Sequence, residues 1–137
     1  MKLRTIMLLW LCFPGFGEEP PPTERGVMVL YRRKDYFGSD FTIKINNQLI
    51  TQKFSNNEYF RLEVPVGKVK IDTEGGFITD KKSMLFSVKS NETVFLKGIV
   101  DYDYLSNALY FKRTDSEQAA KEISKTKLDE TAIKKIE

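Results

Sequence analysis

The chain has 137 residues, the size of one ordinary domain with a substantial core. Its formal net charge is +3, and removing Lys2 and Arg4 from the 22 Lys and Arg residues leaves 20, against 19 Asp and Glu residues. A nearly neutral chain argues against nucleic-acid binding, which needs a basic face. The chain has no histidine and one cysteine, Cys12. This composition excludes an intramolecular disulfide, a thiolate zinc cage and imidazole-based catalysis or metal binding.

The N-terminus has the order of a secretory signal peptide. Two basic residues precede an unbroken apolar run at 6–13, and small residues follow at Gly15 and Gly17. The apolar run is much shorter than the about 20 residues of a membrane-spanning helix. We therefore predict that residues 1–17 are a signal peptide and that the protein is exported to the periplasm, the cell envelope or the medium. A short buried N-terminal helix is the alternative.

Cys12 adds a second hypothesis for the same segment. A cysteine at the end of an apolar signal resembles the lipid-modified cysteine of bacterial lipoproteins, which usually follows a small residue. Here Leu11 stands before the cysteine. Cys12 is therefore either lipidated, in which case it anchors the protein to a membrane, or removed as one more apolar residue of the signal. We expect export in both cases.

A charged, proline-rich segment follows at 18–24. Three consecutive prolines cannot form the interior of a helix or a sheet, so we predict an extended linker. We expect a β-sandwich domain at 25–114 and a C-terminal helix with a charged tail at 115–137.

Hydrophobic alternation with turns at a spacing of about 8–12 residues predicts a sandwich or barrel of about seven strands. Residues 26–33 are apolar on both faces, which favours a central strand. Residues 40–46 and 48–54 alternate around an Asn-Asn turn, as in a hairpin. Gly98 indicates a bulge or a close approach between backbones. The later strand candidates are 84–88, 93–104 and 108–113.

Residues 58–72 form the clearest pair of amphipathic strands, joined by a proline-glycine turn. Pro65 fixes one turn torsion, and Gly67 can adopt a positive φ. We predict that this turn pins the register of the two strands, because a slip of one residue would turn the apolar side chains toward water. The side chains expected in the core are Phe60, Leu62, Val64, Val69 and Ile71.

After the last strand the pattern changes from strand to helix. Thr114 to Glu117 fits a capping box with Thr114 as the N-cap, and residues 118–123 favour helix. The apolar stripe is thin, so the helix should lie against the sheet. From residue 127 the chain is highly charged, and we predict a frayed tail.

This order of strands and turns resembles domain-of-unknown-function family 2846, small exported bacterial proteins. The segments that carry the resemblance are 27–32, 46–48, 57–60, 64–68 and 92–96. The resemblance implies an immunoglobulin-like or transthyretin-like sandwich in the bacterial envelope, often behind a lipoprotein signal. It transfers no catalytic or binding residue. A Tyr-x-x-Leu-x-x-Pro-x-Gly turn is also similar to PEGA and carboxypeptidase-regulatory-like domains.

Two clusters of polar residues and one cluster of aromatic residues are candidate binding or catalytic sites. Asp101 and Asp103 would share a face of an extended strand about 7 Å apart, which suits a carboxylate pair or part of a calcium site. No further acidic residues follow at ligand spacing, so we interpret them as a solvated strand end. The basic run at 32–34 has the same interpretation, with contact to an anionic lipid or polymer as the alternative.

Tyr59, Tyr102 and Tyr104 could form an exposed stacking platform for a carbohydrate or peptidoglycan, or pack across the sheet. No phosphate-binding loop, nucleophile elbow or metalloprotease motif occurs. We expect no cofactor and no enzymatic activity. The expected function is an interaction or structural module whose partner is an envelope protein or a glycan, with membrane contact only if Cys12 is lipidated. Carbohydrate binding and a carboxylate-dependent hydrolase are the alternatives.

Overall fold

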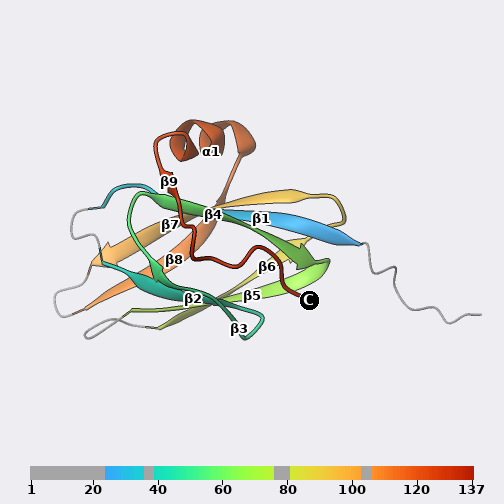
Figure 1. The fold of residues 1–137 in the computed structure, drawn as a ribbon, viewed down its shortest axis with the longest axis horizontal. Helices are drawn as coiled ribbons and strands as arrows, with labels where there is room; N and C mark the ends of the chain where they lie inside the picture. The colour runs from blue at the N-terminus through green and yellow to red at the C-terminus, as the bar shows by residue number, and fades with distance from the viewer. Residues whose placement is uncertain (1–23, 36–38, 76–80, 103–105) are drawn as a thin grey trace, which may run out of the picture.

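The computed structural model describes residues 24–35, 39–75, 81–102 and 106–137. They form two β-sheets packed face to face, with one short helix against the outer face of the larger sheet (Figure 1). The predicted all-β sandwich with a C-terminal helix is confirmed. Within the described residues there are nine strands rather than about seven, and the strand that no predicted segment covers is β9 in the tail.

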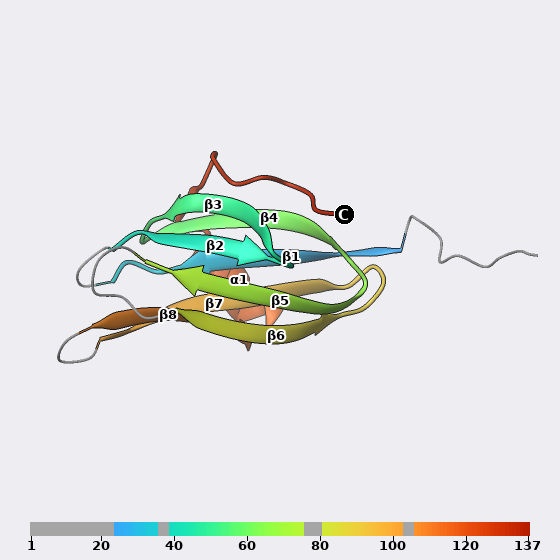
Figure 2. The same ribbon diagram turned by 90° about the horizontal axis from the view of Figure 1, so that it is seen from below.

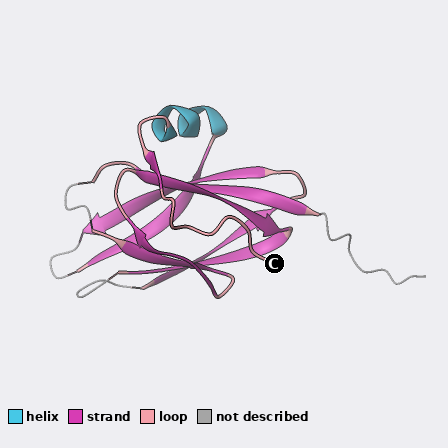
Figure 3. Cartoon of the chain, in the orientation of Figure 1, coloured by secondary structure: helices cyan, strands magenta, loops and turns pink. Residues whose placement is uncertain are grey.

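The larger sheet has the strand order β8-β7-β1-β4-β9, and the smaller sheet has the order β3-β2-β5-β6. Figure 3 shows the strands of both sheets in magenta and the helix in cyan. The pairs β1/β7 and β4/β9 are parallel, whereas the other named pairs are antiparallel. The elements are β1 (Arg25–Arg32), β2 (Phe41–Ile45), β3 (Gln48–Phe54), β4 (Glu58–Pro65), β5 (Gly67–Glu74), β6 (Lys82–Val88), β7 (Thr93–Tyr102), β8 (Asn107–Thr114), α1 (Ser116–Ile123) and β9 (Lys127–Leu128).

The core lies between the two sheets and is filled by the alternating apolar residues of each strand. The predicted core residues of β4 and β5 are all at most 1% exposed, which confirms the predicted faces of both strands. β1 is buried on both faces, as predicted for a central strand. Its Met28 and Leu30 enter the sandwich, while Tyr31 is covered on the opposite face.

The proline-glycine turn joins the two sheets and does not form a hairpin. β4 pairs with β1 and β9, whereas β5 pairs with β2 and β6 (Figure 2). Gly67 has the predicted positive φ, 120°. The prediction that this turn pins the register of two paired strands is nevertheless wrong. The register of β4 is set by its pairing with β1, where Leu62 lies opposite Met28. The prediction failed because a proline-glycine turn can form a corner between two sheets as well as a hairpin.

The helix begins one residue later than predicted. Asp115 is the N-cap, and its carboxylate accepts a hydrogen bond from the Gln118 backbone N–H at 2.8 Å. Thr114 ends β8 instead, and its hydroxyl lies 3.4 Å from the Tyr31 hydroxyl. The capping-box prediction with Thr114 as the N-cap is therefore wrong. The register of β8 against β7 keeps Thr114 in the sheet.

The C-terminal tail, residues 127–137, is ordered against the open side of the sandwich. After β9 it runs across the opening between the two sheets, next to β4 and β3 (Figures 1 and 2). The Ile133 N–H donates to the Ile50 carbonyl of β3 at 3.1 Å. The Glu63 N–H of β4 donates to the Lys134 carbonyl at 2.9 Å. The tail thus joins the edges of both sheets.

The prediction of a frayed tail is wrong because two of its apolar residues enter the core. Ala132 is 8% exposed and Ile136 is 1% exposed. They are four positions apart, and Lys134 stands midway between them, so the sequence shows no continuous alternation that would indicate burial. The tail closes a side of the sandwich that an edge strand alone would leave open to solvent.

Gly98 of β7 lies opposite Arg32 of β1. A Cβ atom added at Gly98 would lie 3.0 Å from Arg32 Cγ and 3.0 Å from Phe111 Cε1. The nearest atoms are side-chain atoms, and the register of β7 runs through Gly98 without a shift, so the predicted bulge or close approach between backbones is wrong. The missing side chain of Gly98 instead makes room for its neighbours' side chains. We expect Gly98→Ala to lower the free energy of unfolding by about 1–3 kcal/mol through overpacking. Urea denaturation measures the loss, with Thr93→Ala, at an exposed position of the same strand, as control. Equal midpoints for Gly98→Ala and wild type would contradict the packing.

Candidate functional site

The predicted tyrosine platform is not assembled from the two tyrosines that the structure describes. Tyr59 lies opposite Tyr31, whose side chain is on the helix-covered face of the larger sheet. Tyr102 is four residues after Gly98 in β7, so both positions point to the same face of the sheet. Gly98 lies opposite Arg32, the neighbour of Tyr31 in β1, so this is the face opposite to that of Tyr31. The Tyr102 hydroxyl donates to Asp35 at 3.2 Å. The sheet thus separates the two rings.

Several predicted residues lie outside the described part of the chain, namely Cys12, Asp103 and Tyr104. The predicted signal peptide lies there too, as does the linker up to residue 23. Asp101, the described member of the acidic pair, is exposed. Over the described ranges, no group of three or more acidic or thiol side chains is placed to hold a metal ion.

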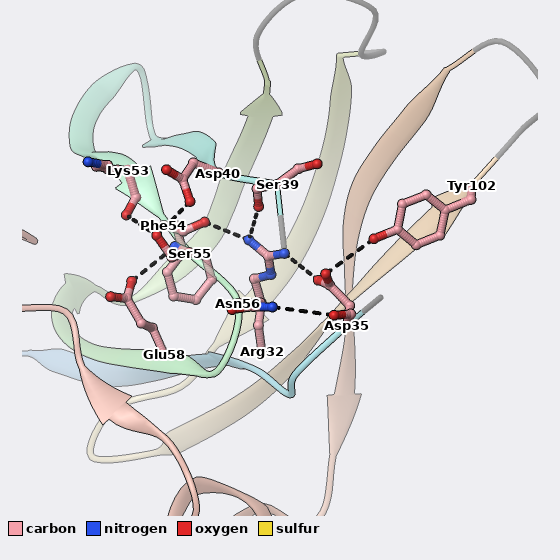
Figure 4. A network of polar contacts seen from close by, with 10 residues as sticks. All are labelled: Arg32, Asp35, Ser39, Asp40, Lys53, Phe54, Ser55, Asn56, Glu58 and Tyr102. Carbon is pink, nitrogen blue, oxygen red and sulfur yellow. Dashed lines mark hydrogen bonds and ion pairs between the residues drawn. The ribbon is translucent and has the colours of Figure 1, made fainter. Parts of the chain in front are cut away.

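The basic run contains a buried arginine. Arg32 is 1% exposed, and its Nη1 donates to the carbonyls of Ser39 at 2.8 Å and Phe54 at 2.6 Å. Its Nη2 forms an ion pair with Asp35 (Figure 4). The guanidinium carbon lies 5.3 Å from the ring centroid of Phe41, within range of a cation–π contact. The interpretation of Arg32 as part of a solvated strand end is therefore wrong.

The contacts of Arg32 hold one end of the sandwich together. Asp35 accepts from Tyr102 at the end of β7, and the Asn56 amide donates to the Asp35 carbonyl at 3.3 Å. The segment after β1 is thereby tied to β7 and to the turn after β3 (Figure 4). Because a buried charge is costly unless it is paired, we assign Arg32 a structural role.

Glu58 lies at the edge of the same network. Burial raises the pKa of Glu58, and the nearby carboxylates of Asp129 and Asp40 raise it further. The Ser55 backbone N–H, which donates to Glu58 at 2.9 Å, acts in the opposite direction. The site therefore favours the protonated form of Glu58 more than water does.

A second cluster fastens α1 to the sheet. The Tyr31 hydroxyl donates to Glu122 Oε1 at 2.6 Å, and Lys97 Nζ lies 3.0 Å from Glu122 Oε2. Burial acts to raise the pKa of Glu122, but hydrogen bonds from Tyr31, Lys97 and Gln118 outweigh burial and hold this pKa below its ordinary value. Burial and the hydrogen bond to Glu122 raise the pKa of Tyr31 to about 12.

These shifts predict a pH dependence of stability. The folded state lowers the pKa of Glu122, so the stability it contributes is present above the unfolded-state pKa and is lost as the pH falls through the folded-state pKa. The raised pKa of Tyr31 predicts a second loss as the pH rises from about 10 to about 12. We expect Glu122→Gln to weaken the acid-side dependence in urea denaturation at pH 7 and pH 3. Glu24→Gln, at an exposed position, is the control, and parallel profiles for wild type and Glu122→Gln would contradict the assignment.

A groove of about 620 Å³ lies between β4 and the C-terminal tail. This volume is within the range of ligand-binding pockets. Residues lining it include Tyr59, Arg61 and Glu63 of β4, together with Leu128, Glu130 and Lys134 of the tail.

The groove exists because the tail leaves β4 and returns to it. Leu128 pairs with Tyr59, and Lys135 pairs with Glu63 further along the strand. Between these points β4 advances four residues, from 59 to 63, and the tail advances seven, from 128 to 135. The extra length carries the tail toward β3 and away from the middle of β4.

Asp129 holds the tail in this detour. It is 5% exposed, and its Oδ2 accepts from the Thr51 hydroxyl at 2.9 Å. Its Oδ1 accepts from the backbone N–H of Thr131 at 2.9 Å and from the Thr131 hydroxyl at 2.6 Å. The register of β3 against β2 shifts near Thr51, as at a β-bulge, which can re-aim a side chain. Three donors therefore satisfy this buried carboxylate.

The backbone of Arg61 faces the groove without a partner among the described residues. In an antiparallel ladder, alternate residues direct their N–H and C=O groups to opposite sides of the strand. The Tyr59 carbonyl accepts from the Asp129 N–H at 2.8 Å, and the Glu63 N–H donates to Lys134, so both residues face the tail. Arg61 lies midway between Tyr59 and Glu63, so its backbone groups point to the same side of β4, where the tail has moved away from the strand. Its N–H and C=O are open to the groove.

No local pattern in the sequence indicates this groove. Tyr59 was a candidate for another reason, and the edge position of β4 could not be inferred while β4 and β5 were expected to form a hairpin. Comparison with family models, curated proteins and solved structures finds no match to this chain. Within the described part of the chain, no helix combines the length and apolar character needed to span a membrane.

Proposed function

We propose that the protein is an exported, non-catalytic interaction module of the bacterial cell envelope. The signal-like N-terminus supports export. The observation that carries the interaction role is the open backbone of Arg61 inside a groove of ligand-binding size. An unpaired donor and acceptor at a strand edge is a ready template for another molecule.

The polar groups around the groove support binding rather than a reaction. Both oxygens of Asp129 already accept hydrogen bonds from threonines, so this carboxylate holds the tail in place. The Glu63 carboxylate lies 3.5 Å from Arg25 Nε. Hydrolysis by a carboxylate pair needs two such groups facing one substrate bond, and these two carboxylates serve structural contacts.

Carbohydrate binding is a second candidate, favoured by one observation. The half-buried residue Tyr59 lines the groove, next to Arg61. An aromatic face beside polar groups can stack on a sugar ring. This candidate uses Tyr59 alone and does not depend on Tyr102.

Affinity capture from envelope extract tests the proposed function, with the exported protein as bait. We expect a protein or glycan that is retained by wild type and by Arg61→Ala but lost with Arg61→Pro, since only proline removes the N–H group that faces the groove. N-terminal sequencing of the exported protein should begin at Glu18. Identical retention by all three baits would contradict binding at the groove. An intact Met1 in the exported protein would contradict the predicted signal peptide.

A further inference from the structure

We infer that the groove binds a short extended peptide segment of a partner protein, which pairs with the open edge of β4 at Arg61. This inference rests on the proposed interaction role and specifies the chemistry of the partner.

The backbone chemistry of Arg61 matches a peptide. Its N–H and C=O lie on the same strand edge, and one residue of an extended chain offers the complementary acceptor and donor with the same spacing. The tail already shows that this edge accepts an extended chain. It pairs with Tyr59 on one side of the gap and with Glu63 on the other, in parallel orientation.

The length of the gap limits the size of the segment. The four residue steps from Tyr59 to Glu63 span roughly 13 Å of strand. The tail occupies both ends of this interval, so about three residues of a partner can lie along β4 between them. The groove therefore suits a chain end or the tip of a loop rather than a long strand.

The charges around the groove favour a segment without strong net charge. Arg61 and Lys134 are basic, whereas Glu63 and Glu130 are acidic. The third acidic lining residue, Asp129, is buried and its carboxylate accepts from Thr51 and Thr131. A polyanion or polycation would meet repulsion from one of these pairs. Leu128 is 47% exposed at the groove and offers a contact for one apolar side chain. We therefore expect a short uncharged segment with an apolar residue.

The test uses a library of random seven-residue peptides against the exported protein. We expect peptides that bind wild type, bind Arg61→Ala within about threefold, and bind Arg61→Pro at least about tenfold more weakly, as the loss of one backbone hydrogen bond implies. The Arg61 N–H is not used in the β1 ladder, and proline is tolerated at strand edges, so the fold should persist. Equal binding by wild type and Arg61→Pro would overturn the inference.

A change in the peptide provides a second test that does not depend on the folding of the proline variant. Each backbone nitrogen of a selected peptide is methylated in turn, which removes one donor at a time. We expect one position to lose at least about tenfold in affinity for wild type, because that donor pairs with the Arg61 carbonyl. An affinity that no single methylation lowers would contradict strand pairing.

A glycan arm separates this inference from the proposed function. The probe is a soluble oligosaccharide of N-acetylated amino sugars. If no peptide binds but this probe binds and Tyr59→Ala abolishes its binding, the peptide inference is overturned while the interaction role stands. If neither probe binds, both the inference and the use of the groove are contradicted.

Discussion

Leu62→Asp is expected to unfold the sandwich. Leu62 is fully buried in β4, opposite Met28 of the central strand, and belongs to the core between the sheets. Losing a buried leucine side chain costs about 2–5 kcal/mol. Placing a carboxylate in the same apolar site adds a further penalty. The sum is comparable with the entire stability of an ordinary domain, about 5–15 kcal/mol.

Circular dichroism during heating measures this effect. We expect Leu62→Asp to show no cooperative transition. Arg61→Asp, one residue away but exposed, should melt within a few degrees of wild type, since surface substitutions usually change stability by about 0.5 kcal/mol or less. A native-like melting curve for Leu62→Asp would show that the wrong face of β4 has been placed inside.

Arg32→Ala is expected to lower the free energy of unfolding by about 3–5 kcal/mol, the usual cost of breaking a buried ion pair from one side. The substitution leaves the carbonyls of Ser39 and Phe54 and the carboxylate of Asp35 without their shared donor. It also opens a void beside Phe41.

Urea denaturation of Arg32→Ala, Arg32→Lys and Lys34→Ala tests this role. Lysine keeps the charge but cannot hold two carbonyls and a carboxylate in the planar geometry of the guanidinium, so we expect most of the loss to remain. Lys34 is exposed at the end of the same basic run, and its loss should be nearly neutral. Equal midpoints for Arg32→Ala and Lys34→Ala would show that the arginine is solvated, as the sequence first indicated.

The strand faces could be predicted from sequence because the alternation of apolar residues is a local signal. Leu62, Val69 and Ile71 are expected in the core on that signal, and all three are fully buried. The Asn46-Asn47 turn is an equally local signal, and both residues have the positive φ of a tight hairpin turn. Local patterns do not state which strands pair, so the sheet change at Gly67 was missed.

The candidate site depends on contacts between residues far apart in the chain. Asp129 contacts Thr51, 78 positions earlier, and Ile136 enters the core between the two sheets. Neither belongs to a periodic pattern. Arg32 was read as solvated because arginine is rarely buried. Its side chain packs against Gly98, where an added Cβ would lie 3.0 Å from Arg32 Cγ, and this contact between two strands leaves no local signal in the sequence.

Amide hydrogen exchange at Arg61 tests the central claim most directly, namely that the edge of β4 is open for binding. Phe60 and Leu62 direct their N–H groups to β1, whereas the Arg61 N–H faces the groove. We predict that the Arg61 amide of the free protein exchanges at least about 100-fold faster than its two neighbours, and that a bound peptide slows it. Equal protection of all three amides in the free protein would show that the edge is already closed and would contradict the account.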